Sequence, residues 1–327
     1  MKSIEEVENW LKQMGIKNYK INDNLTIDVN DNVYLDHNHL SSIPVKFKEI
    51  NGHFNCSNNQ LITLEGCPNI VHGDFDCSYN QLTTLKGSPE IVDHDFNCSY
   101  NKLISLEGNI EKVDWNFNCS YNKIESLEGG PKEVSEDYDC SYNELTTLEG
   151  CPKEINRNFY CSYNKLVTLK GAPNKIYGNF ICSNNRLASL ESSPQEIYGN
   201  FDCSYNYLVS LENCPKKIDY GFYCSYNNIT SLKGSPEIIN HNFDCSHNKL
   251  TNLEGGPKKI HANYDCSHNQ LTSLKGCPTE VGWDFDCSSN KIVSLEDFPE
   301  KIFANFIFRD NPLYLVIKQC IFETMPK

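Results

Sequence analysis

A Cys-Ser pair recurs every 21 residues along most of this chain, and no insertion separates the copies. The cysteines of this series are Cys56, Cys77, Cys98, Cys119, Cys140, Cys161, Cys182, Cys203, Cys224, Cys245, Cys266 and Cys287. A fixed short period means that each segment is one turn of a superhelix, which cannot bury its apolar residues without its neighbours. The sequence therefore predicts a solenoid over residues 35–313, with about 14 turns, of which 12 are regular.

The apolar positions within one turn predict which side chains face the core. Residues 71–92 read VHGDFDCSYNQLTTLKGSPEIV. The positions expected to point inward are Phe75, Cys77, Leu82, Leu85 and Val92. The alternation around Phe75 indicates a short strand that stacks in parallel on its equivalents and forms a concave sheet. Pro89 predicts an extended convex segment, since 21 residues leave no room for a full convex helix.

Helices are expected to cover both ends of the stack. Ser3 and Glu6 form a capping-box pattern that starts a helix ending near Gly15. Asn311 and Pro312 are expected as the N-cap and first residue of a closing helix. The predicted division is an N-terminal helix and strand cap over 1–34, the solenoid over 35–313, and a C-terminal helical cap over 314–327.

Composition restricts the partners and the compartment. The formal net charge of -14 opposes binding to nucleic acid or to anionic membranes, and it favours a protein partner with a basic patch. No apolar stretch approaches the roughly 18 residues that span a bilayer. The chain starts without an apolar signal region, so we expect its 17 cysteines to be reduced and the protein to be cytoplasmic.

Two columns of the repeat are predicted to be structural. Thiols stacked on parallel strands lie wider apart than a disulfide prefers, and no histidine shares their face to complete a metal site. The cysteines are therefore expected as buried free thiols, with no metal and no cofactor. The asparagine that follows three residues later, as in Asn80, is expected to pair backbone groups that would otherwise be buried without partners.

The pattern F-x-C-S-x-N-x-L-x-x-L-x-G-x-P resembles the leucine-rich repeat, whose core is L-x-L-x-x-N-x-L, in the short form of bacterial effector proteins. With its W-L-K-x-x-x-I-x-N-Y leader, it is also similar to repeat proteins of tailed bacteriophages. The resemblance covers roughly residues 30–313. It implies an α/β leucine-rich-repeat solenoid, or horseshoe, with a parallel concave β-sheet, extended convex segments and helical caps. It also implies a binding scaffold and leaves the ligand open.

An aromatic column stands just beyond the predicted strand. Its tyrosines are Tyr79, Tyr100, Tyr121, Tyr142, Tyr163, Tyr205 and Tyr226, and His247 and His268 continue it. We expect these rings to stack in a ladder on the concave face. The ladder is either structural or a recognition surface, because tyrosine is enriched at binding hot spots.

Two further columns flank the inward phenylalanine and carry aspartates. These are Asp74, Asp95, Asp137 and Asp284 before the phenylalanine, and Asp76, Asp139, Asp202, Asp244, Asp265 and Asp286 after it. No lysine or arginine occupies these columns in the regular turns, whereas both signs are mixed elsewhere. This bias favours a basic partner, and solubility is the alternative explanation. Paired aspartates are weak candidates for calcium, because no shaped loop accompanies them.

The sequence predicts a non-enzymatic scaffold that binds a protein through this concave face. No non-repeating site gathers an acid, a base and a nucleophile, so no catalytic residue is predicted. The bacteriophage resemblance suggests a host protein that is blocked by occlusion in the host cytoplasm. The alternatives are an acidic mimic of nucleic acid and a structural, virion-associated component. The oligomeric state and any pH or metal role of His247 and His268 stay open.

Overall fold

The computed structural model describes residues 3–324, and the side chains of residues 319–324 are outside this description. The chain begins with helix α1 (Ile4–Gln13). Ser3 is its N-cap, as predicted, and its Oγ accepts a hydrogen bond of 3.2 Å from the Glu6 N–H. Val7, Trp10 and Leu11 are buried on one side of the helix.

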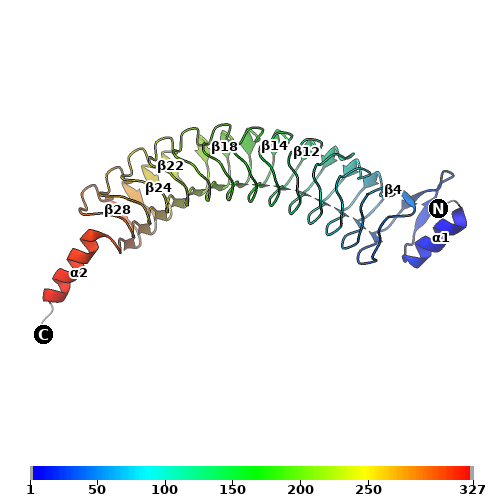
Figure 1. Ribbon diagram of the computed structural model, residues 1–327, viewed down its shortest axis with the longest axis horizontal. Helices are drawn as coiled ribbons and strands as arrows, with labels where there is room; N and C mark the ends of the chain where they lie inside the picture. The colour runs from blue at the N-terminus through cyan, green and yellow to red at the C-terminus, as the bar shows by residue number, and fades with distance from the viewer. Residues whose placement is uncertain (1–2, 325–327) are drawn as a thin grey trace. The chain divides into compact units, whose positions relative to one another are not determined.

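Contacts divide the chain into two compact units. The first unit contains the residues up to Lys165 together with Gly171–Pro173, and the second contains Leu166–Lys170 together with the residues from Asn174 onward. Each regular turn in either unit contributes two short strands that follow one another across a tight bend (Figure 1). We call the strand before the bend the first-row strand, and the strand after it, which carries the inward Phe or Tyr, the second-row strand.

In the first unit, β1 (Tyr19–Ile21) precedes the two rows and pairs antiparallel with β2. The first row consists of β2 (Thr26–Val29), β4 (Lys46–Ile50), β6 (Ile70–Val71), β8 (Ile91–Val92), β10 (Lys112–Val113), β12 (Glu133–Val134) and β14 (Glu154–Ile155). The second row consists of β3 (Val33–Tyr34), β5 (Phe54–Asn55), β7 (Phe75–Asp76), β9 (Phe96–Asn97), β11 (Phe117–Asn118), β13 (Tyr138–Asp139) and β15 (Phe159–Tyr160).

The second unit repeats this arrangement. Its first row consists of β16 (Lys175–Ile176), β18 (Glu196–Ile197), β20 (Lys217–Ile218), β22 (Ile238–Ile239), β24 (Lys259–Ile260), β26 (Glu280–Val281) and β28 (Lys301–Ile302). Its second row consists of β17 (Phe180–Ile181), β19 (Phe201–Asp202), β21 (Phe222–Tyr223), β23 (Phe243–Asp244), β25 (Tyr264–Asp265), β27 (Phe285–Asp286) and β29 (Phe306–Ile307). Helix α2 (Pro312–Thr324) follows.

Strands of one row pair in parallel with a register shift of one repeat. In the second row, for example, Phe54 pairs with Phe75 and Asn55 pairs with Asp76. The second row is continuous within each unit, whereas first-row strand β12 ends a sheet and is not paired with β14 in the described structure. A similar break separates β20 from β22.

The core lies between the two strand rows and the leucine-lined return path. Phe75, Cys77, Leu82, Leu85 and Val92 are fully buried, as the repeat predicts. The inward rings of successive turns contact one another, with centroids 5.0 Å apart for the Phe75 and Phe96 pair and 5.8 Å apart for the Phe54 and Phe75 pair. Each turn therefore completes the core of its neighbour.

The described cysteines confirm the predicted buried thiols. All members of the repeat column are buried without exposure to solvent. Cys151 and Cys277, which precede the prolines, are only partly buried.

The C-terminal end differs from the predicted cap. Helix α2 starts at Pro312, as expected, but Leu315 and Val316 are 61% and 58% exposed. The Asn311 side chain does not cap this helix, because its amide instead hydrogen-bonds the backbone of the preceding turns. The closing helix was also expected to carry Gln319, Cys320 and Phe322, whose side chains lie outside the described part of the structure.

Candidate functional site

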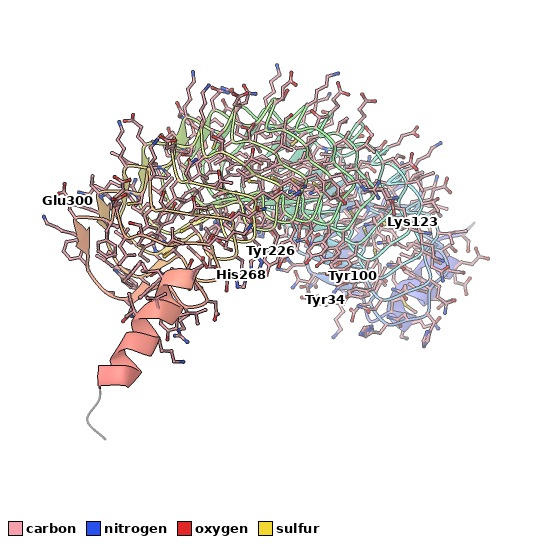
Figure 2. All side chains as sticks on the ribbon, turned by 60° about the vertical axis from the view of Figure 1, so that its left-hand side comes forward. Tyr34, Tyr100, Lys123, Tyr226, His268 and Glu300 are labelled. Atoms are coloured by element: carbon pink, nitrogen blue, oxygen red, sulfur yellow. The ribbon has the colours of Figure 1, made fainter. Side chains whose placement is uncertain are left out.

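The predicted binding columns lie at the bend before the second-row strands, on these strands, and in the turn that follows them. We define the Tyr–Asp face as the residues equivalent to Asp74, Asp76 and Tyr79 in each turn. Tyr100 and Tyr226, labelled in Figure 2, represent its aromatic column in the first and second unit.

The Asn80 column fixes the backbone of the turn that carries the Tyr79 column. Asn80 Nδ2 donates to the carbonyl oxygens of Cys56, Cys77 and Ser78 at 3.0–3.2 Å. Its Oδ1 accepts the Leu61 N–H at 2.9 Å, so one side chain joins two successive turns. The predicted role of this column is confirmed, and the turn is fixed because buried backbone groups cannot lose these partners without cost.

The aromatic column has an unusual backbone conformation. Tyr79 through Tyr163 have φ between 52° and 55°, in the left-handed region that is unfavourable for most residues with a Cβ. Asn58 and Asn184 occupy the equivalent position in two other turns with φ of 53° and 56°. Asparagine tolerates this conformation well, whereas tyrosine pays about 1–2 kcal/mol for it.

The rings of the first unit stack as predicted. Tyr79, Tyr100, Tyr121, Tyr142 and Tyr163 have centroids 4.2–4.3 Å apart and planes within 9° of parallel. They are 38–50% exposed, so their faces cover one another while their edges reach solvent. Hydrogen bonding to Tyr142, together with partial desolvation, raises the pKa of Tyr121.

The second unit carries a shorter, mixed ladder. Tyr205 and Tyr226 stack at 4.3 Å, Tyr226 and His247 at 4.0 Å, and His247 and His268 at 4.1 Å. Burial, followed by the neighbouring His268, lowers the pKa of His247. The histidines thus replace tyrosine as stacked rings and continue the aromatic column, as expected from the sequence.

The Asp76 column has a structural role that the sequence interpretation missed. Asp76 Oδ1 accepts the Ser78 N–H at 2.9 Å, two residues ahead, and so closes an Asx-turn. Asn97 and Asn118 accept the equivalent bonds from Ser99 and Ser120. Either residue type therefore shapes this turn.

The Asp74 column forms a second ladder at the bend between the two strand rows. Asp95 accepts the Asn116 N–H at 3.1 Å, and Asn116 in turn accepts the Asp137 N–H at 2.9 Å. Aspartate and asparagine again serve equally, because each bond needs only one side-chain oxygen. The predicted aspartates are thus half-buried residues that combine backbone pairing with charge, rather than free surface charges.

The charge of several of these aspartates is opposed by their surroundings. Burial raises the pKa of Asp139, Asp202 and Asp265, although hydrogen bonds from the following serines act in the other direction. A neutral asparagine would supply the same backbone bond without desolvating a carboxylate. The backbone therefore does not account for the choice of aspartate at these positions.

Cavities accompany the Tyr–Asp face in both units. In the first unit a cavity of about 350 Å³ is lined by Tyr34, His53, Phe54, Asn55, Asp74, Phe75, Asp76, Asp95 and Asn97. In the second unit a cavity of about 420 Å³ is lined by Asn185, Tyr205, Asn206, Tyr207, Tyr226, Asn227 and His247. The Tyr–Asp face therefore contains cavities that could accept side chains of a partner protein.

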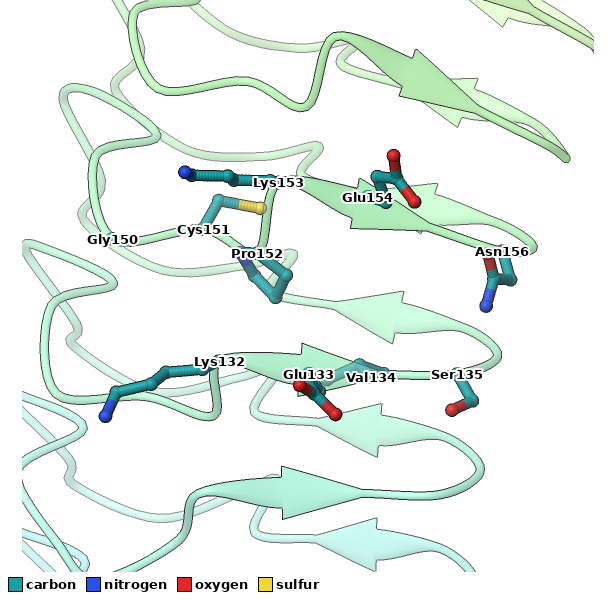
Figure 3. Close-up of a pocket in the computed structure, with 10 residues that line it drawn as sticks. All are labelled: Lys132, Glu133, Val134, Ser135, Gly150, Cys151, Pro152, Lys153, Glu154 and Asn156. Carbon is teal, nitrogen blue, oxygen red and sulfur yellow. The ribbon is translucent and has the colours of Figure 1, made fainter.

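A larger cleft lies on the first strand row, away from the predicted site. It has a volume of about 670 Å³ and is found where the pairing of β12 and β14 is interrupted (Figure 3). Its lining mixes charges of both signs, from Lys132, Glu133, Lys153 and Glu154, with the partly buried Cys151. This cleft could not be predicted from the sequence, because the repeat itself continues without change.

Histidines at the bends were also missed. His53 Nδ1 lies 3.0 Å from Asp74 Oδ2, and His94 Nδ1 lies 3.7 Å from Asp74 Oδ1. The signal was the replacement of the usual Asn or Asp by His53, one period before Asp74, with His94 in the adjacent column.

No helix in the described part of the chain is long and apolar enough to cross a membrane.

No family model matches this chain, and no curated protein sequence matches it. Solved structures with the same fold are leucine-rich-repeat proteins. YopM, a leucine-rich effector protein from Yersinia pestis, is 17% identical with a TM-score of 0.52, over 86% of this chain and 84% of that chain. A leucine-rich repeat protein from Bacteroides eggerthii is 15% identical with a TM-score of 0.53, over 81% and 53%. The leucine-rich repeat domain of APL1B is 14% identical with a TM-score of 0.54, over 89% and 87%. The fold is that of a leucine-rich-repeat solenoid.

Proposed function

We propose that this protein is a non-enzymatic scaffold that binds another protein through the Tyr–Asp face. The observation that carries this proposal is the use of tyrosine at a left-handed backbone position that Asn58 and Asn184 also occupy. Each stacked pair contributes about 0.5–1.5 kcal/mol. This gain is offset by the backbone cost of about 1–2 kcal/mol per tyrosine, so stability alone does not explain the column.

Contact with a partner does explain it. Tyrosine offers a rigid amphipathic surface, and stacking on its neighbours fixes each ring before binding, which reduces the entropy lost on association. The exposed edges carry hydroxyl groups that can donate or accept hydrogen bonds.

The aspartates indicate the charge of the partner. They stand where asparagine would suffice for the backbone, and burial opposes the ionisation of Asp139, Asp202 and Asp265. These carboxylates would attract a basic patch on the partner, since complementary charge accelerates association and orients the complex.

We further propose that the partner is a host protein that is blocked by occlusion, in line with the resemblance of the repeat to bacterial effector and bacteriophage proteins. A reducing compartment such as the cytoplasm suits a chain with so many buried cysteines.

The test is a comparison of three forms of the full chain in capture of proteins from candidate host lysates, followed by affinity measurement with the purified partner. The forms are the wild type, the triple variant Tyr100→Asn/Tyr121→Asn/Tyr142→Asn, and the control Lys132→Ala/Lys153→Ala at the cleft of Figure 3. Asparagine is chosen because it fits the left-handed position.

We expect the triple tyrosine variant to bind at least about 30-fold more weakly, since each hot-spot aromatic commonly contributes about 2 kcal/mol or more. The control should bind as the wild type does. If the control loses binding while the tyrosine variant keeps it, the cleft on the first strand row is the binding site. If double-stranded DNA or RNA displaces the partner competitively, the nucleic-acid-mimic alternative gains support instead.

A further inference from the structure

We propose that His53, Asp74 and His94 bind a divalent transition-metal ion such as Zn²⁺. The ligand atoms of these three residues all lie within 4.8 Å of one another. Two imidazoles and a carboxylate are ligands that zinc and its neighbours in the first transition series prefer. The site lies in the first unit and shares Asp74 with the Tyr–Asp face, but the inference rests on the geometry of the three side chains and not on the proposed protein-binding function.

The distances already approach those of a bound ion. Two ligands of a tetrahedral Zn²⁺, each about 2.0–2.1 Å from the metal, lie about 3.3 Å apart. The His53 Nδ1 to Asp74 Oδ2 distance is 3.0 Å, and the His94 Nδ1 to Asp74 Oδ1 distance is 3.7 Å. Small side-chain rotations would therefore bring the three donors to one centre.

Both histidines are oriented by their neighbours. The His94 ring stacks on Trp115 with centroids 4.4 Å apart and planes 17° from parallel. His53 Nδ1 lies 2.9 Å from the Asp74 N–H, and in the tautomer that accepts this bond the nitrogen carries the lone pair that a metal requires. An ion at Nδ1 would replace that hydrogen bond.

The repeat explains why the residues converge. His53 stands in the column of Asn32, Asp74 and Asp95, where a side chain at one bend meets the backbone of the next. His94 lies one position before Asp95, so its ring reaches back to Asp74. Three successive bends thus contribute one ligand each, and an ion would tie these turns together.

The coordination would be open on one side. His53 and Asp74 line the cavity of about 350 Å³, where Asp76 and Asp95 add carboxylates. A metal with three protein ligands keeps a position for water or for a group of another molecule. The three side chains are 37–45% exposed, so an ion can enter from solvent.

A neighbouring histidine offers a useful contrast. His72 lies 2.7 Å from Asp93 through Nδ1 and 3.2 Å from Glu49 through Nε2. Because its two carboxylates face opposite ring nitrogens, they cannot share one ion with it. His72 therefore has acidic neighbours without the geometry of a metal site.

The experiment is a calorimetric titration of the full, tag-free chain with Zn²⁺, with Mg²⁺ as a reference for nonspecific binding to the acidic surface. The variants are His53→Asn, which restores the amide found at Asn32, and His94→Phe, which keeps a ring on Trp115. Asp74→Asn preserves the acceptor for the Asp95 N–H. The control is His247→Asn/His268→Asn, and circular dichroism verifies folding of every form.

We expect one Zn²⁺ per chain at micromolar concentrations, a higher Tm in its presence, and no comparable effect of Mg²⁺. Each ligand variant should weaken binding by at least about 10-fold, and the control should bind normally. The proposal is overturned if wild type takes up no Zn²⁺ at about 100 μM, if the folded ligand variants bind as wild type does, or if only the control loses binding. Should one variant fail to fold, the other two decide.

Discussion

Tyr121 stacks on Tyr142 with ring centroids 4.2 Å apart and planes 9° from parallel, although both residues have a left-handed backbone. The left-handed backbone that positions the rings costs free energy, and this cost offsets the stabilisation from ring stacking. This balance gives the first prediction.

Replacing Tyr121 with asparagine should change the free energy of unfolding by no more than about 1 kcal/mol. The variant loses two stacked pairs, with Tyr100 and Tyr142, but it relieves the left-handed strain. Tyr121→Ala loses the same pairs and keeps the strain, so it should be less stable than the asparagine variant. Urea unfolding of the three forms measures both differences, and equal stability of the alanine and asparagine variants would contradict the strain argument.

Replacing Asn143 with alanine should destabilise the protein by at least about 3 kcal/mol. Asn143 Nδ2 donates to the carbonyls of Cys119, Cys140 and Ser141, and its Oδ1 accepts the Ile124 N–H. Asn143→Asp should also be destabilised, because a carboxylate cannot donate to those carbonyls. Thermal unfolding checks both variants, with exposed Lys123→Ala as a control expected within about 0.5 kcal/mol of wild type.

Replacing Tyr138 with phenylalanine should stabilise the protein by about 1–3 kcal/mol. Tyr138 stands in the inward phenylalanine column, and its buried hydroxyl has no hydrogen-bond partner in the described structure. Tyr264 occupies the same column, but its hydroxyl receives a long contact of 4.0 Å from the Cys245 thiol. Tyr264→Phe should therefore gain less, and chemical denaturation of the two variants gives the comparison. A loss of stability in Tyr138→Phe would indicate that this hydroxyl is satisfied.

Replacing Asp139 with asparagine should stabilise the protein at neutral pH and less so in acid. Burial raises the pKa of Asp139, so the folded protein binds this proton more tightly than the unfolded chain does. The associated stability is complete below the unfolded pKa and is lost as pH rises through the folded value. Asn118 shows that an amide keeps the turn bond. Unfolding at several pH values, with Glu125→Gln as the surface control, tests whether the advantage of Asp139→Asn grows with pH.

Thiol titration of the native protein should modify Cys151 and Cys277 first among the described cysteines. Both are partly exposed, whereas the repeat column is fully buried. Reaction should still be slow, because burial raises the pKa of Cys277 to about 12 and little reactive thiolate is present at neutral pH. Mass spectrometry locates the modified residues, and early labelling of Cys119 or Cys140 would show that the turns open readily.

The repeat allowed the inward columns, the asparagine ladder and the stacked tyrosines to be predicted, because each is a periodic choice of residue type with one physical explanation. The first-row strands of the regular turns were not predicted as strands. Segments such as Glu133–Val134 are only two residues long, which is too short for an alternating pattern to be recognised.

Other features of the site were beyond sequence reasoning for different reasons. Aspartate serves equally as a charge and as a backbone acceptor, so the hydrogen bonds of Asp76 and Asp95 could not be separated from a role in recognition. The approach of His53 to His94 depends on contact between adjacent columns of different turns. Helix α2 was predicted from its starting residues, but periodicity does not determine whether Leu315 and Val316 are covered.

The asparagine ladder also bears on how such a gene can change length. Each regular turn contacts the next through the same residue types, spaced 21 residues apart. The deletion or duplication of one whole 21-residue segment would therefore restore equivalent contacts between turns. A deletion that is not a multiple of 21 residues would shift the columns, so that the core positions would no longer receive the required phenylalanine and cysteine. Repeats of equal length favour unequal recombination, and the surviving products would be those that conserve the turn. The Tyr–Asp face can therefore lengthen or shorten by one repeat at a time while the packing of the core stays the same.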